Sequence, residues 1–385
     1  NTTPGDLTNG HNNSYRDHDW GFNYEPTRGN EVFFPRGRVV GGSSAVNTTI
    51  AVRSLPEDHQ EWAEAGHTEW SWEKVLPAFN RLERDLDYPD APFHGDAGPI
   101  SIRRYRHDEL LPQHQAFLAS AESLGYPACP DANDPDLFGA GPQPMNKLGR
   151  LRISCAIGYL APARLRENLE IRANTTVQRL LIEGRRCTGV DVAYADGSRQ
   201  TLNAKLVVLS AGAIMSPTVL LRSGIGPAAE LQALGIDVCR DIAGVGKNLC
   251  DHPALSVVCS VHDSELINHD APLIQTILRY TADGSDKRND LQIEQLSFAG
   301  RPGQGPRFAI AAVLEYQYGR GELRLRSADP KEAPIIDNRF CEDPTDAQRL
   351  ASCVRDTLAF TRKGELADMI SDISFPDPER GHDEE

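Results

Sequence analysis

The sequence is poor in positive charge and has no long apolar run. Its 40 Lys and Arg residues stand against 55 Asp and Glu residues, which gives a formal net charge of −15 at pH 7. Because nucleic-acid surfaces need clustered Lys and Arg, we expect no nucleic-acid partner. A membrane-spanning helix needs about 20 consecutive apolar residues, so we also expect no membrane span. The acidic balance is compatible with a small neutral substrate.

None of the eight cysteines belongs to a Cys-x-x-Cys pair. Scattered cysteines argue against structural zinc and against a disulfide framework, and we expect no metal site. A reduced, intracellular protein with a cytoplasmic location is the expectation. The cysteines are Cys129, Cys155, Cys187, Cys239, Cys250, Cys259, Cys341 and Cys353.

A Gly-x-Gly-x-x-Gly turn between a strand and a helix, which begins many dinucleotide-binding folds, is also missing. The sequence starts at Asn1 without a methionine or a signal peptide and ends in the charged run 382–385. We therefore expect the chain to be a segment cut at both ends. Its 385 residues are still enough for two domains and a large buried core.

What the sequence does contain is a stretch of small residues at 36–53, RGRVVGGSSAVNTTIAVR. Adjacent Gly41 and Gly42 remove two Cβ atoms, so the backbone can press against a flat or charged ligand. Free amide groups in such a turn form an anion-binding concavity, and Asn47 adds side-chain donors and an acceptor. The alternative is a tight turn before a helix, because short motifs often match by chance.

A second small-residue turn follows the apolar run 206–210, which we expect to be a buried parallel strand. Ala211, Gly212 and Ala213 come next, and Ser216 and Pro217 begin a helix. A strand that leads through small residues into a helix N-terminus can receive a dinucleotide. The alternative is an ordinary turn, because any doubly wound fold contains such turns.

Together, the segments 36–53 and 209–226 closely resemble the two signatures of the glucose–methanol–choline (GMC) oxidoreductases, which are FAD-dependent alcohol oxidases and dehydrogenases. The resemblance continues through Trp62, Trp70 and Trp72 and covers nearly the whole chain. Within the family, the run 83–102, ERDLDYPDAPFHGDAGPISI, looks most like the 5-(hydroxymethyl)furfural-type oxidases.

The resemblance implies that FAD is the cofactor. The Gly-x-Gly-x-x-Gly unit of the family precedes the first signature, so we expect weak or no FAD retention by this chain alone. Some relatives carry a flavin-linking histidine where Val46 stands, and we therefore expect non-covalent FAD. Val177 is implied to offer its backbone to the adenine, the alternative being an ordinary core valine. The implied FAD-binding residues are Val40, Gly41, Gly42, Ser43, Asn47, Thr48, Thr49, Ile50, Val177, Ala211 and Gly212.

The reaction implied by the resemblance is alcohol oxidation. A histidine removes the hydroxyl proton while the carbinol hydride moves to flavin N5, and oxygen or another acceptor then takes the electrons. That histidine lies in a His-Pro-x-Gly-Thr run of the family, which this sequence lacks, so we assign no catalytic residue. The expected function is FAD-dependent oxidation of a primary alcohol, in a truncated chain that is inactive alone. The alternatives are a hydroxynitrile lyase of the same family and a non-catalytic remnant or binding module.

The expected fold class is α/β, with an incomplete Rossmann-like FAD-binding domain and a substrate domain built on an antiparallel sheet. Residues 1–80 and 152–255 are assigned to the two parts of the FAD-binding domain. Residues 81–151 are assigned to part of the substrate domain and an entrance loop, and residues 256–385 to the substrate domain and a return helix.

Local patterns give further expectations. Strands are expected at 254–261, 290–298, 308–316 and 321–327 for the substrate sheet, and at 169–172 and 175–183. Residues 1–35 should form a surface loop, and 57–87 and 344–369 should be helical. The three tryptophans named above should pack in the core.

Two polar groups invite a functional reading. Asp251 and His252 are adjacent, but one Asp-His pair without a nucleophile is more often a structural hydrogen bond, and we read it so. Alternation in the strands cannot say which face meets the substrate. The plausible wall residues of the substrate site are Gln292, Gln295, Tyr316, Gln317 and Tyr318.

Overall fold

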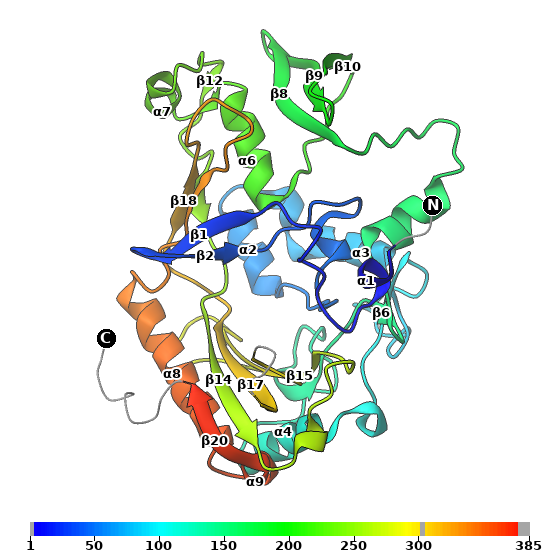
Figure 1. Cartoon of the computed structure of the whole chain (residues 1–385), viewed down its shortest axis with the longest axis vertical. Coiled ribbons are helices and arrows are strands. Elements are labelled where there is room, and N and C mark those ends of the chain that lie inside the picture. Colours follow the sequence, from blue (N-terminus) through cyan, green and yellow to red (C-terminus); the bar gives the residue numbers. More distant parts are fainter. Residues whose placement is uncertain (1–3, 301–304, 376–385) are drawn as a thin grey trace.

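A six-stranded antiparallel sheet forms the lower half of the molecule in Figure 1. The computed structural model describes residues 4–300 and 305–375, so the charged run 382–385 lies outside the described residues. The strand order is β20-β14-β17-β16-β15-β5. The strands are β5 (Gly139–Pro142), β14 (Ala254–Val261), β15 (Ile274–Tyr280), β16 (Leu291–Leu296), β17 (Arg307–Leu314) and β20 (Ile370–Phe375).

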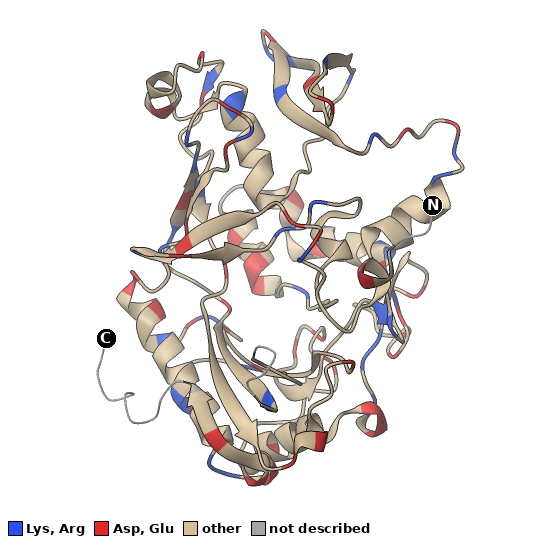
Figure 2. Ribbon diagram, in the orientation of Figure 1, with Lys and Arg blue, Asp and Glu red and all other residues tan. Residues whose placement is uncertain are grey.

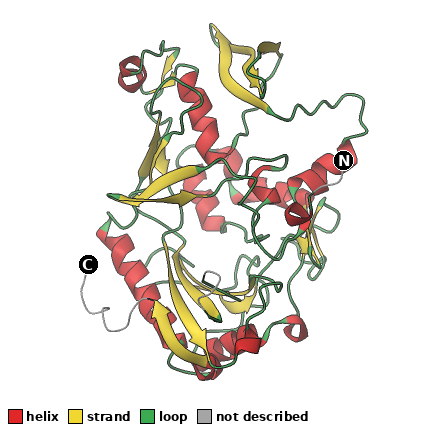
Figure 3. Cartoon of the chain, viewed as in Figure 1, coloured by secondary structure: helices red, strands yellow, loops and turns green. Residues whose placement is uncertain are grey.

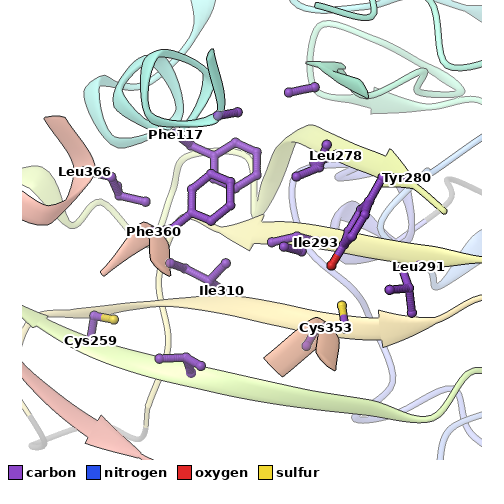
Figure 4. Close-up of a cluster of buried hydrophobic side chains, with 14 of the residues drawn as sticks. Phe117, Cys259, Leu278, Tyr280, Leu291, Ile293, Ile310, Cys353, Phe360 and Leu366 are labelled. Carbon is purple, nitrogen blue, oxygen red and sulfur yellow. The ribbon is translucent and has the colours of Figure 1, made fainter. Parts of the chain in front are cut away.

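Helices cover one face of this sheet and leave the other face to a cavity. The covering helices are α4 (Pro112–Ser123), α8 (Pro344–Phe360) and α9 (Glu365–Met369). Side chains alternate between the faces of a strand, so Leu291 and Ile293 of β16 join the apolar core, where Phe117 stacks on Phe360 with ring centroids 4.9 Å apart (Figure 4). The residues between them on β16 therefore point to the opposite face.

A second, smaller sheet lies above the first in Figure 1, with the order β13-β18-β19-β1-β2. Its apolar core joins the sheet to α6 (Gly212–Arg222) and α7 (Ala228–Ala233) through Phe22, Ile214 and Leu231. Only the pairing of β1 with β19 is parallel among the ladders described for this sheet. The strands are β1 (Phe22–Thr27), β2 (Asn30–Phe34), β13 (Lys247–Leu249), β18 (Gly321–Arg324) and β19 (Ile335–Asp337).

Shorter elements complete the mixed α/β arrangement (Figure 3). A three-stranded antiparallel unit at the top of Figure 1 contains β8 (Thr175–Glu183), β9 (Arg186–Tyr194) and β10 (Arg199–Asn203). The two-stranded pairs are β3 (Glu83–Asp85) with β4 (Ile100–Ile102), β6 (Lys147–Leu148) with β7 (Leu151–Arg152), and β11 (Ile225–Gly226) with β12 (Arg240–Asp241). The remaining helices are α1 (Gly5–Thr8), α2 (Pro56–Glu64), α3 (Trp72–Leu82) and α5 (Ala161–Ala163), with short helical turns at η1 (Gly42–Ala45), η2 (Thr68–Trp70), η3 (His107–Glu109), η4 (Ala156–Leu160) and η5 (Ser264–Leu266).

The strand predicted at 206–210 is wrong. The segment forms no strand, and Leu206 and Val208 are 78% and 76% exposed. An apolar run becomes a buried strand only when neighbouring strands pair with it, and no strand in the described ranges does so. Residues 169–172 likewise form no strand.

The N-terminal residues and the tryptophans also depart from expectation. Residues 1–35 contain the β1–β2 hairpin rather than only a loop, because its aromatic residues Phe22 and Phe34 are buried in the core of the second sheet. The helix predicted at 57–87 is two helices separated by η2, and its last part is wrong, because residues 83–85 form strand β3. Trp62 and Trp70 are 51% and 54% exposed, with ring centroids 5.5 Å apart, so they pack on each other at the surface instead of in the core. No helix in the described part of the chain is long and apolar enough to cross a membrane.

Candidate active site

The glycine pair of the 36–53 segment forms a sharp turn with one open side. Gly41 and Gly42 have φ angles of +99° and +57°, a backbone region that favours glycine. The Gly42 amide donates to the carbonyl oxygen of Val39 at 2.8 Å. A Cβ added to Gly41 would lie 3.0 Å from the Cβ of Ala156, whereas a Cβ added to Gly42 would meet no atom within 4 Å. The free space for a ligand therefore lies at Gly42.

A buried arginine holds this turn from behind. Arg152 has no exposed surface, and burial lowers the pKa of its guanidinium. Because backbone carbonyls carry partial negative charge, several of them together can stabilise a buried cation. The guanidinium donates to the carbonyl oxygens of Asp6, Leu7, Asn12, Ala45 and Asn47.

Thr49 adopts an unusual backbone conformation at the end of the turn. Its φ angle is +68°, which is strained for a β-branched residue, and its side chain is fully buried. The Asn47 Oδ1 accepts a hydrogen bond from the Thr49 amide at 3.1 Å, and the Thr49 carbonyl accepts one from the Asn146 amide at 2.8 Å. Asn47 is expected to contact the cofactor, and that expectation stays a prediction. In the structure its side-chain oxygen stabilises the turn itself.

A cavity of about 780 Å³ lies between residues 50–64 and the open face of the six-stranded sheet. Ile50 lies at one wall, and another wall contains Gln292 and Tyr316, two of the candidate wall residues of the substrate site. Gln295 is buried on the opposite face of β16, so its prediction as a wall residue is wrong. Gln317 and Tyr318 are not among the residues that line the cavity.

Three polar residues that the sequence analysis missed lie on the sheet side of the cavity: Arg279, Glu294 and Glu315. Arg279 is opposite Gln292 in the β15–β16 ladder, and Glu294 occupies the next position on the same face. Burial and the nearby Glu315 raise the pKa of Glu294 to about 8. At neutral pH the Glu294 carboxyl is therefore mostly protonated and can donate a hydrogen bond into the cavity. The alternation of LQIEQL in β16 was the available signal, because it places Gln292 and Glu294 on one face.

Ion pairs join α2 to residues 287–288 on the side of the cavity where these residues line it. Glu57 of α2 accepts hydrogen bonds from Arg288 at 2.8 and 2.9 Å, and Glu61 pairs with Lys287 at 2.7 Å. The Tyr316 hydroxyl also donates to Glu61 at 3.0 Å. In Figure 2 the acidic residues of α2 (red) lie above the sheet that carries the cavity floor. These contacts connect elements that are far apart in the sequence.

The Asp251–His252 pair does not form a dyad. Asp251 pairs with Arg36 at 3.1 Å and accepts a hydrogen bond from the backbone amide of His252 at 2.9 Å. The His252 side chain instead lines the large cavity, with its Nε2 3.6 Å from a carboxylate oxygen of Glu315. The interpretation of the pair as a structural hydrogen bond therefore holds for Asp251, whereas the His252 side chain lines the cavity.

The remaining predicted residues lie on separate elements. Val177 is on β8 opposite Val192, and it is half-buried. Ala211 and Gly212 are exposed at the start of α6, where Gly212 has a φ angle of +81°. The Ala211 amide donates to the Ser216 Oγ at 2.9 Å. Val40, Ser43 and Thr48 are exposed or half-buried within the first segment, as a ligand contact requires.

A buried charged network fixes the loop that contains His94. Its ring lies 2.7 Å from both a Glu83 and an Asp131 carboxylate oxygen. Desolvation lowers the pKa of His94, but these hydrogen bonds and the charge of Asp85 outweigh it and raise the pKa to about 9. Ligand atoms of Glu83, Asp85 and His94 lie within 4.8 Å of one another. Arg104 also pairs with Asp85 at 2.9 Å, so protein cations already neutralise this cluster.

The sequence match and the likeness of the fold together place the chain in a class of flavin-dependent oxidoreductases. The family model for the GMC oxidoreductases matches residues 21–254, which is more than half of the chain. The chain therefore belongs to the GMC oxidoreductase family, whose members are FAD-dependent oxidoreductases that act on alcohols. This confirms the resemblance found in the two signatures, and the α/β fold class with it.

Individual relatives agree with this assignment. The chain is 38% identical over 331 residues to the 5-(hydroxymethyl)furfural oxidase of Methylovorus sp., a match that covers 84% of this chain and 61% of that protein. It is 31% identical over 369 residues to the mitochondrial choline dehydrogenase of Homo sapiens, covering 88% and 61%. The crystal structure of pyridoxine 4-oxidase from Mesorbium loti superposes with a TM-score of 0.90 at 26% identity, covering 98% of this chain and 76% of that one. The chain thus spans less than two thirds of the length of the first two proteins.

Proposed function

We propose that the chain contributes to FAD-dependent oxidation of a primary alcohol by hydride transfer to a non-covalently bound flavin. Family membership and the open turn at Gly42 support this proposal. The electron acceptor is oxygen or another small oxidant. The observation that carries the proposal is that Ile50 belongs both to the signature segment and to the wall of the large cavity. A cofactor held by that segment would therefore adjoin the substrate.

The residues of the turn fit a flat cofactor. Bound FAD would accept the hydride from the alcohol carbon. Gly42 leaves the space that a side chain would fill, and Arg152 keeps the backbone of Ala45 and Asn47 in place. Val46 is fully buried, and its side chain offers no nucleophile for a covalent link to flavin. Val177, Ala211 and Gly212 complete the proposed set of contacts from other elements.

The cavity floor suits a substrate with a hydroxyl group. Glu294 can donate a hydrogen bond in its neutral form, and Gln292 offers both a donor and an acceptor beside it. The names of the relatives point to hydroxymethyl-bearing furans and to choline as substrates of those proteins. We propose an alcohol of similar size for this chain.

A matched pair of glycine variants tests the cofactor site. Gly42 and Gly184 have φ angles of +57° and +60°, and a Cβ at either position meets no atom within 4 Å. Gly42→Val and Gly184→Val therefore impose the same backbone strain, but only the first fills the proposed flavin space. Titration of each protein with FAD, followed by flavin fluorescence, should give at least about tenfold weaker binding for Gly42→Val, equivalent to about 1.4 kcal/mol. Equal affinities in the two variants would remove the basis for placing flavin at Gly42.

Flavin absorbance separates oxidation from lyase chemistry. Anaerobic addition of 5-(hydroxymethyl)furfural to an FAD-bound protein that contains this chain at the full length of its relatives should bleach the absorbance of oxidised flavin if hydride reaches the cofactor. A hydroxynitrile lyase leaves the flavin oxidised. Persistent colour with every primary alcohol tested contradicts the proposed reaction.

A further inference from the structure

A second cavity of about 220 Å³ lies behind the signature segment, on the other side of a short backbone bridge. Arg103 and Met145 exchange backbone hydrogen bonds of 2.9 and 3.0 Å at its wall. The neighbouring Asn146 amide donates to the carbonyl of Thr49. The cavity is therefore separate from the large cavity but is connected to the strained end of the glycine turn.

Lys147 is the unusual group in this cavity. It is only 2% exposed, and its Nζ has no hydrogen-bond partner among the described residues. Lys147 lies directly opposite Arg152 in the β6–β7 ladder. Two cations in opposite positions of a ladder repel each other. The Arg152 guanidinium is satisfied by backbone carbonyls, whereas the Lys147 ammonium is left without an acceptor.

A second buried donor without a hydrogen-bond partner among the described residues lines the same cavity. The Tyr105 hydroxyl is buried and has no partner in the described part of the protein. The Lys147 Nζ lies over the face of the Tyr105 ring, 4.7 Å from its centroid, and this cation–π contact leaves both the ammonium and the hydroxyl without a hydrogen-bond acceptor among the described residues. Buried polar groups are nearly always hydrogen-bonded, and an unpaired pair of donors indicates a missing acceptor.

The charges around the cavity favour an anion. Glu109 is the carboxylate that lines it, and Arg103 already pairs with Glu109 at 2.5 Å. Arg150, by contrast, contributes an exposed cation at the rim. Burial, followed by repulsion from Arg103 and Arg152, lowers the pKa of Lys147 to about 7. A bound anion would reverse this effect by stabilising the charged form of the lysine.

We propose that this cavity binds a small oxyanion, with the Lys147 ammonium and the Tyr105 hydroxyl as its principal donors. Its volume of about 220 Å³ suits a phosphate or a small carboxylate with a few waters, at about 30 Å³ for each water. The ligand supplies the acceptor that both donors lack. Because the cavity wall is hydrogen-bonded to Thr49, an occupant also stabilises the segment proposed to hold the flavin. The site does not depend on the proposed oxidation.

Calorimetric titration with inorganic phosphate tests the site, with sodium chloride at matched ionic strength as the reference. Wild-type protein should bind phosphate saturably, and Lys147→Met should weaken binding at least about tenfold, because a charge-assisted hydrogen bond is lost. Lys331 is exposed, so Lys331→Met serves as the matched control and should leave the affinity unchanged. An equal affinity in Lys147→Met, or no saturable binding by wild type, overturns the proposal.

Three further titrations extend this test: one with a tyrosine variant, one with acetate and one in the presence of FAD. Tyr105→Phe removes only the hydroxyl and should weaken phosphate binding several-fold, and it also tests the site if Lys147→Met does not fold. Acetate in place of phosphate distinguishes carboxylate from tetrahedral anions. Titration at saturating FAD should give a phosphate affinity at least as high as that without FAD, because an anion that stabilises the flavin segment is in turn favoured by the flavin, whereas competition would show that phosphate occupies the flavin site and would overturn a separate anion site.

Sulfate keeps its charge over the accessible pH range, so it reports the protonation of the protein. Its affinity should fall as the pH rises above about 7, because Lys147 then loses its proton. Lys147→Met should remove that dependence, and an unchanged pH profile in the variant contradicts the assignment. The titratable or charged groups that face or adjoin the Lys147 ammonium are His11, Arg103, Arg104, Tyr105, Glu109, Arg150 and Arg152.

Discussion

Arg152 shows how one side chain can fix a functional turn without any acidic partner. Its guanidinium donates hydrogen bonds to backbone carbonyls of α1, of the following loop and of the 36–53 segment. The rigid fork of an arginine can donate in several directions at once, which a lysine ammonium cannot reproduce in the same geometry. The orientation of the glycine turn therefore depends on a residue that never faces its open side.

Replacing Arg152 should be among the most damaging single changes. Arg152→Met leaves several buried carbonyls unpaired, each of which costs about 1–3 kcal/mol, so we expect a loss of about 3 kcal/mol or more in the free energy of unfolding. Urea denaturation measures this loss. Arg185→Met, at an exposed position, is the control and should change stability little. A loss below about 1 kcal/mol for Arg152→Met would show that the carbonyls find other partners.

Glu294 should make stability depend on pH. The unfolded carboxyl loses its proton above its ordinary pKa of 4.5, whereas the folded one keeps it until about 8. Stability should therefore fall as the pH rises from about 4.5 to 8, by at most about 1.4 kcal/mol for each pH unit. Glu294→Gln mimics the protonated form, so it should match wild type at pH 4.5 and be more stable at pH 8.5. Parallel stability curves for the two proteins contradict the raised pKa.

At the scale of elements, local sequence patterns predicted the bounds of several strands but not the contacts that these strands make with distant segments. The sequence predicted β8 and β14 with their observed bounds, because turn residues flank β-rich runs. The run 206–210 failed because its burial depends on partner strands, which its own residues do not specify. The role of Arg152 had no local signal, because its acceptors come from distant segments. Gln292 was predictable as a wall residue, and strand alternation could have added Glu294.

Helix α4 carries a buried histidine that should make the protein sensitive to acid. Burial lowers the pKa of His114 to about 3, and its ring lies 2.8 and 2.9 Å from the hydroxyls of Thr276 and Ser297. The unfolded histidine takes up a proton below pH 6.5, so stability should fall between pH 6.5 and about 3. His114→Gln should flatten this part of the thermal stability profile, at a cost of about 1–2 kcal/mol at pH 7 from altered hydrogen bonds.

His107 provides the control for that measurement. It is exposed in η3, so His107→Gln should leave the acid profile unchanged. If His114→Gln loses stability in acid as steeply as wild type, another group is responsible for the effect.

At the scale of the whole molecule, the large cavity is enclosed by contributions from both halves. Residues 50–64 supply one side and the six-stranded sheet the other, and Glu57 meets Arg288 across 231 positions of sequence. The domain boundaries predicted from the sequence remain a prediction. The ion pairs of Glu57 and Glu61 are partly exposed, and such pairs contribute little to global stability.

Removing these ion pairs should increase the local mobility of residues 284–289 more than it lowers the global stability of the protein. We expect Glu57→Gln with Glu61→Gln to change the free energy of unfolding by about 1 kcal/mol or less for each pair. Amide hydrogen exchange in residues 284–289 should nevertheless become faster, because the loop loses its anchors on α2. Glu73→Gln, at an exposed position of α3, is the control. Unchanged exchange in the double variant contradicts a role of these pairs in holding the loop.

The two ion pairs between α2 and residues 287–288 have a consequence for the rates of ligand binding and release. A neutral ligand that passes between α2 and residues 287–288 has to separate the Glu57–Arg288 and Glu61–Lys287 pairs both on entry and on release. Added salt weakens exposed ion pairs and should speed arrival and departure alike. The residence time of a neutral alcohol should therefore shorten with ionic strength while its equilibrium affinity stays constant.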